Sequence, residues 1–182
     1  NADEGRFYWR TNQWLLPYFT LVASDIEGRI GLGEMFVPVD DTHTQVWTLK
    51  WSLKAPLTDN DRYIMTNGAF PQVGTLDPAT GRLRATRQNH FLQDRRYQRV
   101  GGSFTGIHGV REQDTAVVEG MGDIVDRTKE HLGTSDMAVI AMRRILLNGA
   151  KALLRGEEPA VPHQPDAYGV HSWSAVIGQD RD

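Results

Sequence analysis

Side chains alternate between apolar and polar from Val46 to Leu53, and this pattern constrains the fold most. The apolar positions are Trp47, Leu49, Trp51 and Leu53. Successive side chains of a β-strand point to opposite faces of a sheet, so the alternation predicts a strand whose apolar face covers a core or a cavity. Trp47 and Trp51 are therefore expected in the wall of that core or cavity.

Three other segments of the first half are rich in aromatic and β-branched residues, which favour strands. They cover residues 7–10, 14–22 and 31–39. Asp40-Asp41-Thr42 follows the last of them and has the composition of a turn. The turn predicts a hairpin with antiparallel pairing.

The middle of the chain is less regular. Residues 59–61 and 77–81 carry turn chemistry. Residues 82–99 are polar, contain six arginines and predict a short helix with a loop. The arginines could meet a carboxylated substrate, a partner protein or a neighbouring subunit, but solvated surface charge is the simpler interpretation.

Two helices are predicted in the second half. The first runs from about Glu112 to Thr128, with an apolar stripe at helical spacing. The second begins at Thr134 or Ser135 and ends near Arg155, where Gly156 stops it. Strands followed by helices predict an α+β fold, with helices packed on one face of an antiparallel sheet.

The length of 182 residues suits one domain. We expect residues 1–156 to form it. Residues 157–182 contain Pro159, Pro162 and Pro165 and are expected to form an extended tail, which either wraps the domain or stays loose.

Composition excludes several classes of function. The chain has no cysteine, which rules out a disulfide scaffold, a cysteine nucleophile and a thiolate metal site. Its net charge is −3 with acids and bases mixed, so neither a nucleic-acid surface nor a polybasic membrane anchor is expected. Apolar runs are too short to span a bilayer. A cytoplasmic protein is the default expectation.

Asp114 lies near the start of the first predicted helix, and its position permits two interpretations. Val117, Val118 and Met121 share its side of the helix, so the carboxylate would point toward the cavity. A carboxylate on a rigid helix is suited to hold a metal ion. An acid in the first turn also stabilises a helix by up to about 1 kcal/mol without any metal. The residues alone leave both interpretations open.

The six histidines are His43, His90, His108, His131, His163 and His171. His108 comes just before the Asp114 helix. It either lines the cavity or belongs to a solvated loop.

The run from Asp114 to Asp136 resembles the C-terminal end of the catalytic domain in Rieske non-haem iron oxygenases, in the branch that contains phthalate 4,5-dioxygenase and aromatic O-demethylases. The helix motif of this run is the specific part, and the aromatic strands alone would be a weak match. Phe7-Tyr8-Trp9-Arg10 and the hairpin around residues 37–47 also resemble that family. The similarity covers most of residues 7–155.

The resemblance implies a helix-grip fold (START/Bet v 1-like), in which a curved sheet grips a long helix. It implies an iron(II) site of two histidines and one aspartate, and the matching aspartate here is Asp114. Val117, Val118, Met121, His108, Trp47 and Trp51 would line the substrate pocket. The family's two ligand histidines lie four residues apart on one helix, and no pair here has that spacing.

The same resemblance implies that this chain lacks two parts of the full enzyme. A Rieske [2Fe-2S] cluster needs two cysteines and two histidines, so this chain cannot carry it. The cluster and the histidine helix are expected in sequence outside residues 1–182. A reductase or ferredoxin would deliver electrons, and dioxygen would be used for ring dihydroxylation or O-demethylation of an aromatic compound. The full-length enzyme is expected to be a homotrimer.

Two alternatives remain. The same architecture binds apolar or aromatic ligands without metal, so the chain could be a metal-free binding module. It could also be an inactive fragment.

Overall fold

The structure is a computed structural model that describes residues 5–23, 30–67 and 76–178. The chain divides into two units. The first combines Asn1–Ala55 with Asp126–Asp182, and the second is Pro56–Val125. Each unit is described by itself.

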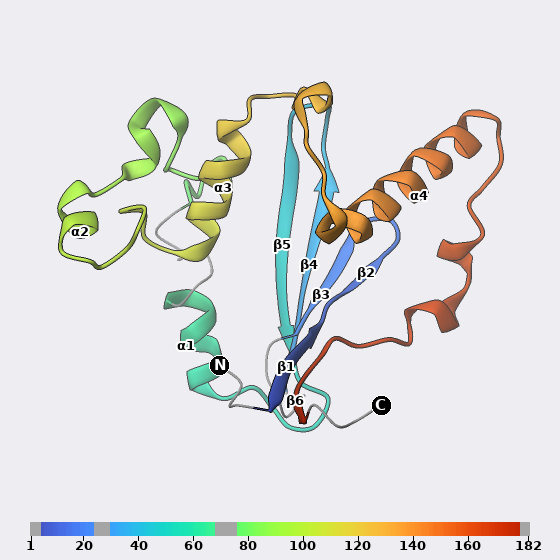
Figure 1. The fold of residues 1–182 in the computed structure, drawn as a ribbon, viewed down its shortest axis with the longest axis horizontal. Helices are drawn as coiled ribbons and strands as arrows, with labels where there is room; N and C mark the ends of the chain where they lie inside the picture. The colour runs from blue at the N-terminus through green and yellow to red at the C-terminus, as the bar shows by residue number, and fades with distance from the viewer. Residues whose placement is uncertain (1–4, 24–29, 68–75, 179–182) are drawn as a thin grey trace. The chain divides into compact units, whose positions relative to one another are not determined.

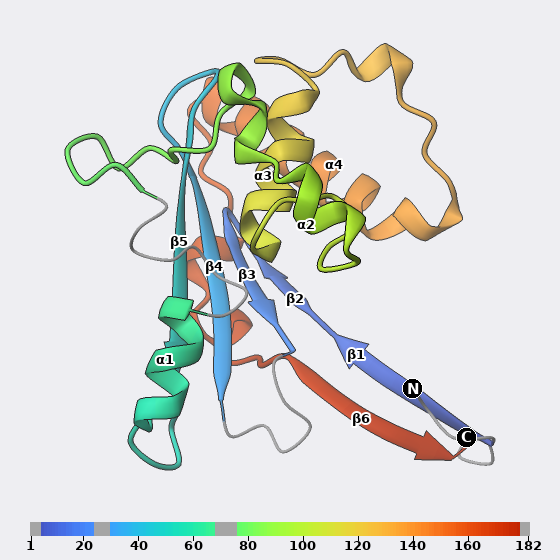
Figure 2. The ribbon, with the colours of Figure 1, turned by 90° about the vertical axis from the view of Figure 1, so that its left-hand side faces the viewer.

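Among the described residues of the first unit, six strands form two antiparallel sheets (Figure 1). β2 (Gln13–Leu15), β3 (Phe19–Val22), β4 (Gly31–Pro38) and β5 (Thr44–Trp51) lie side by side in that order. β1 (Arg6–Thr11) pairs with β6 (Trp173–Gly178), and Figure 2 shows these two as a separate ribbon. Antiparallel sheets with several helices confirm the predicted α+β class, which is consistent with a helix-grip catalytic domain.

The single strand expected over residues 14–22 is wrong, because β2 and β3 are two strands of a hairpin. Pro17 lies in the turn between them. Proline lacks the N–H that a central strand position would donate, so it interrupts the pairing here.

The predicted turn at residues 40–42 is confirmed. The N–H of Val39 donates to the carbonyl of His43 at 2.9 Å, and Asp40 Oδ1 accepts from the N–H groups of Thr42 and His43, both at 2.8 Å. The predicted strand is confirmed as β5, which ends at Trp51. The expectation that its apolar face covers a core is wrong for Trp47 and Leu49, which are exposed among the described residues. Leu53 lies beyond the strand and is exposed.

The pKa of Asp40 should lie well below that of an ordinary aspartate. The backbone hydrogen bond from Thr42 and the side chain of His43 lower its pKa from 3.8 to about 2. A carboxyl group with a lowered folded pKa contributes stability above its unfolded pKa, and the contribution is lost as pH falls from about 3.8 toward 2. A carboxyl-carbon NMR titration should give the low value, and Thr42→Val should raise it. A titration midpoint near 3.8 for Asp40 in the wild-type protein would contradict the hydrogen bonds of this turn.

Gly31 has no room for a side chain. A Cβ atom there would lie 2.2 Å from Cε2 of Trp51, its cross-strand partner. We expect Gly31→Ala to reduce the free energy of unfolding by about 1–3 kcal/mol, because the indole must shift. Gly178→Ala in β6 is the matched control, since its Cβ would meet nothing within 4 Å. Equal urea midpoints for the two variants would contradict the packing of Trp51 on β4.

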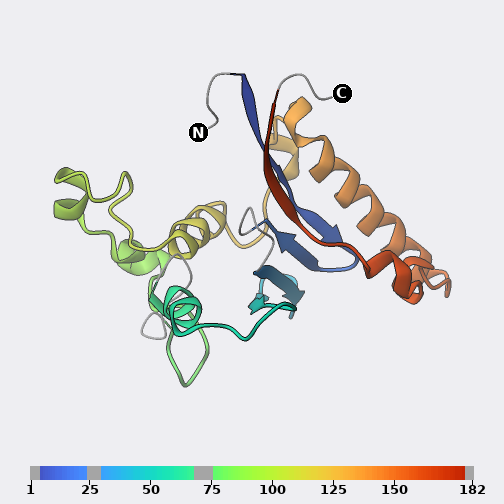
Figure 3. The ribbon, with the colours of Figure 1, turned by 90° about the horizontal axis from the view of Figure 1, so that it is seen from below.

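The long helix of the first unit confirms the second predicted helix. A 3-10 turn, η4 (Thr134–Asp136), leads into α4 (Met137–Leu154), the continuous orange helix of Figure 3. Arg143 of α4 donates to both carboxylate oxygens of Glu130, at 2.7 and 3.1 Å. This bidentate pair connects α4 to the segment that follows η3 (Arg127–Lys129).

Residues after 156 pair with β1 through β6 and also contact the β2–β3–β4–β5 sheet through two side chains. Tyr168, in the last turn of η6 (Pro165–Tyr168), donates its hydroxyl to the carbonyl of Leu16 at 2.8 Å. Ser172 donates to the carbonyl of Val22 at 2.9 Å, just before β6. The preceding short helix is η5 (Val161–His163).

The second unit contains α1 (Asp59–Asn67), η2 (Arg87–Leu92), α2 (Arg95–Arg99) and α3 (Val110–Gly120). The turn expected at residues 59–61 is wrong, because α1 begins there. Asp61 Oδ2 accepts from the N–H and hydroxyl of Thr58, at 2.8 and 2.7 Å, and the Thr58 hydroxyl accepts from the Asp61 N–H. This reciprocal capping starts the helix.

The helix expected from Glu112 to Thr128 is shorter and begins earlier, at Val110. Gly122 has φ +92 and follows the C-cap residue Met121. A glycine in the left-handed region ends a helix, so Ile124 and Val125 lie outside α3. The short helix with a loop expected over residues 82–99 is present as η2 and α2.

Candidate functional site

The first turn of α3 is built around Gly109, its N-cap residue. Gly109 has φ +86, which favours glycine, and a Cβ there would lie 1.9 Å from Oε2 of Glu112. Glu112 is only 6% exposed, and its Oε2 has no hydrogen-bond partner among the described residues. The glycine is thus required both by its backbone conformation and by the carboxylate folded against it.

Gln113 joins this turn to the preceding loop. Its Nε2 donates to the carbonyl of Gly109 at 3.0 Å, and its Oε1 accepts from the hydroxyl of Thr105 at 3.1 Å. The Thr105 hydroxyl also accepts from the N–H of Ile107 at 3.1 Å. Loop and helix are therefore fixed together immediately before Asp114.

Asp114 itself is exposed, and so are Val117, Val118 and Met121 on the same helix. Arg111 lies half-buried one turn before. Burial lowers the pKa of its guanidinium, and the nearby charges of Asp114 and Glu112 act in the opposite direction. The structure thus places an accessible carboxylate among accessible apolar side chains.

His108 lies apart from that stripe. Its ring stacks on Tyr97, with centroids 4.2 Å apart. The two rings line a shallow depression of about 310 Å³ together with Gly102, Ser103, Phe104, Ile107, Gly109 and Gln113. Asp114 is not among these residues. Trp47 and Trp51, the other predicted pocket residues, belong to β5 of the first unit.

No three side chains of His, Cys, Asp or Glu among the described residues lie close enough together to hold a metal ion. A two-histidine-one-carboxylate site needs three ligands. Asp114 supplies one oxygen donor, so these residues do not by themselves fit a complete iron(II) site.

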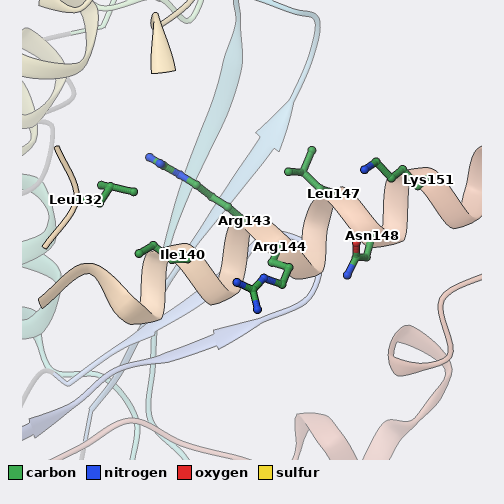
Figure 4. A pocket seen from close by; sticks show the side chains of 7 residues that line it. All are labelled: Leu132, Ile140, Arg143, Arg144, Leu147, Asn148 and Lys151. Carbon is green, nitrogen blue, oxygen red and sulfur yellow. The ribbon is translucent and has the colours of Figure 1, made fainter. Parts of the chain in front are cut away.

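α4 carries a second shallow depression, of about 340 Å³ (Figure 4). Its lining combines apolar and cationic side chains: Leu132, Ile140, Arg143, Arg144, Leu147, Asn148 and Lys151. Arg143 is already paired with Glu130. The depression is open. Its cationic side chains can attract an anion, but the depression does not enclose one.

Sequence reasoning missed Thr105, Gln113 and the buried Glu112. A glycine three residues before a glutamate at the predicted helix start was the one local signal for Glu112. Nothing local indicated that Thr105 would reach Gln113.

Within the described residues, no helix combines the length and apolar character needed to cross a bilayer.

Comparison with known proteins adds three findings. The whole chain, residues 1–182, matches a family model described as LigXa C-terminal domain like. The chain is 33% identical over 184 residues to the phthalate 4,5-dioxygenase oxygenase subunit of Pseudomonas putida, which covers 96% of this chain and 39% of that protein. It is 31% identical over 163 residues to the 3-chlorobenzoate-3,4-dioxygenase oxygenase subunit of Comamonas testosteroni, covering 83% and 37% respectively. The chain thus spans well under half the length of these relatives.

Proposed function

Because the chain belongs to the LigXa C-terminal domain-like family, we propose that it is part of the catalytic domain of a Rieske-type non-haem iron oxygenase that oxidises an aromatic compound. The observation that carries this proposal is the family match over the full chain, together with two relatives that are oxygenase subunits of aromatic dioxygenases. The resemblance of residues 114–136 to such a domain agrees with both.

Asp114 is the carboxylate that we assign to the iron(II) site. It is exposed on α3, and the turn before it is held by Gln113, next to the buried Glu112. The accessible side chains of Val117, Val118 and Met121 suit contact with an aromatic ring. The two histidine ligands and the Rieske cluster would come from residues outside this chain.

Partners follow from the same proposal. The full-length protein would take an aromatic substrate and dioxygen, receive electrons from a reductase or ferredoxin, and assemble as a homotrimer. His108, in the same unit as Asp114, would contribute to the pocket.

A metal-free binding module is the second candidate. It is favoured by the exposed Asp114 and by the lack of a three-donor group among the described residues. In this case the α3 stripe would contact an apolar ligand and no oxidation would follow.

Oxygen uptake by the full-length protein separates the two candidates. With its electron donor, we expect uptake that depends on an added aromatic acid such as phthalate or 3-chlorobenzoate. Mass spectrometry of the product would distinguish gain of two oxygen atoms from loss of a methyl group. An iron-free protein that binds the aromatic compound and consumes no oxygen would refute the oxygenase and support the binding module.

A further inference from the structure

Two side chains, Thr105 and Gln113, tie the loop before α3 to the first turn of the helix, and we call this pair the α3 tether. The Thr105 hydroxyl donates to Gln113 Oε1 at 3.1 Å, and Gln113 Nε2 donates to the carbonyl of Gly109 at 3.0 Å. The contact joins positions eight residues apart in the sequence. The tether therefore connects the loop to the helix immediately before Asp114.

The loop holds the Thr105 hydroxyl in one direction. A threonine hydroxyl has one hydrogen to donate and two lone pairs to accept. Its hydrogen goes to Gln113, and its oxygen accepts from the N–H of Ile107 at 3.1 Å. The Ser103 hydroxyl lies 3.0 Å from it and can donate to the second lone pair. Ile107 is buried, so rotation of Thr105 would leave a buried N–H unpaired.

The neighbours of the Gln113 amide fix its orientation. The carbonyl of Gly109 can only accept, so the amide nitrogen must face it and the amide oxygen is left to accept from Thr105. Exchange of oxygen and nitrogen would break the bond to Gly109. One end of the amide is thus specified by the N-cap residue of α3 and the other by the loop.

The direction of the Asp114 side chain depends on this helix start. Successive residues of an α-helix are about 100° apart around its axis, so fixing Gln113 also fixes the direction of the Cα–Cβ bond of Asp114. The exposed Asp114 carboxylate takes part in none of the hydrogen bonds of the tether. A metal ligand must stay within about 0.5 Å and 10–20° of its productive geometry, and its surroundings must enforce this.

We propose that Thr105 and Gln113 are positioning residues for the iron(II) site, because the α3 tether holds the Asp114 carboxylate in the direction that the metal needs. This inference rests on the function proposed above. In this role neither residue binds the metal, and both act through the start of α3. Loss of a group that orients a metal ligand typically reduces metal affinity about 10–100-fold. The tether acts on the helix and not on the carboxylate itself, so we expect the lower end of that range.

The test measures the affinity of the full-length protein for the iron outside the Rieske cluster, by competition with a ferrous chelator. Thr105→Val and Gln113→Leu, the two tether variants, should each lower this affinity about tenfold. The double variant should lose no more than the larger single loss, because both substitutions remove the same contact. Thr105→Ser keeps the hydroxyl and should restore the wild-type affinity.

Gln113→Leu decides the matter if Thr105→Val does not fold. The N–H of Ile107 then stays paired with the Thr105 hydroxyl. The carbonyl of Gly109 still accepts from the backbone N–H of residue 113, at 3.4 Å. The substitution therefore removes the tether without leaving either backbone group unpaired.

Thr58→Val is the matched control, because it also removes a threonine hydroxyl that holds the start of a helix in the second unit. It should lower the urea midpoint and leave the iron affinity unchanged. With nitric oxide as a probe, the rhombicity of the EPR spectrum of the ferrous site should change in the tether variants and match the wild type in Thr58→Val and Thr105→Ser. In the metal-free protein, hydrogen exchange at the α3 amides should be faster in the tether variants alone.

Wild-type iron affinity in the tether variants, while Asp114→Ala loses the iron, would overturn the positioning role and leave the proposed function standing. An equal loss of affinity in Thr58→Val, or no recovery in Thr105→Ser, would also overturn the role, because the effect would then come from stability or from side-chain volume. Retention of the iron by Asp114→Ala would instead remove the assigned ligand, and the positioning role with it.

Discussion

Asp114→Ala in the full-length protein should remove the iron that lies outside the Rieske cluster and abolish aromatic oxidation while leaving the fold intact. Loss of an outer-shell partner of a metal typically reduces metal affinity about 10–100-fold, and loss of a ligand should exceed that range. Stability should change little, within about 0.5 kcal/mol, because the side chain is exposed and accepts none of the hydrogen bonds that hold the start of α3.

Glu119→Ala is the matched control for this experiment. Glu119 is an exposed acid on the same helix, five residues further on, and it faces another side. The iron content measured by plasma emission should fall by about one iron per subunit in the Asp114 variant alone, because the iron of the Rieske cluster stays bound. Circular dichroism should be unchanged in both variants. An undiminished iron content in Asp114→Ala, or the same fall in Glu119→Ala, would remove the assigned ligand.

Gly106→Ala should be among the most destabilising single substitutions in the second unit. Gly106 is buried with φ +73, and a Cβ there would lie 2.5 Å from the carbonyl oxygen of Asp94. Backbone strain costs about 1–3 kcal/mol and overpacking against a fixed backbone adds about 1–3 kcal/mol, so we expect a loss of roughly 2–6 kcal/mol. The clash also breaks the hydrogen bond that joins Asp94 to Gly106.

Gly81→Ala separates the two causes of that loss. Gly81 has φ +68 but nothing within 4 Å of its Cβ position, so it should show backbone strain alone, about 1–2 kcal/mol. Urea unfolding gives both values, and hydrogen exchange of the α3 amides should report loosening only for Gly106→Ala. Equal losses in the two variants would mean that loop and α2 are not in contact.

Patterns that reside in a few neighbouring residues predicted their structures well. The alternation before Trp51 gave β5, and the caps around Thr134 and Gly156 gave α4. α3 was predicted too long because its apolar stripe continues past the residue where the backbone turns, at Gly122. Thr58 and Asp61 carry a capping signal that was interpreted as a turn.

Other features could not be predicted because tertiary contacts determine them. His90, Phe91 and Leu92 have φ between 52 and 54, a left-handed conformation that Phe and Leu rarely adopt. The hydrogen bond from Tyr168 to Leu16 joins positions 152 residues apart. Asp114 was identified from helical spacing and family resemblance, whereas the Thr105–Gln113 contact that holds its helix depends on how the loop folds back.

The most direct test is a crystal structure of the full-length protein with iron, using anomalous scattering at the iron absorption edge. Besides the signal of the Rieske cluster, we predict one further peak per subunit within bonding distance of the Asp114 carboxylate, completed by two histidines from outside residues 1–182. A non-cluster peak coordinated without Asp114, or no non-cluster peak in protein that still oxidises its aromatic substrate, would contradict the proposed site.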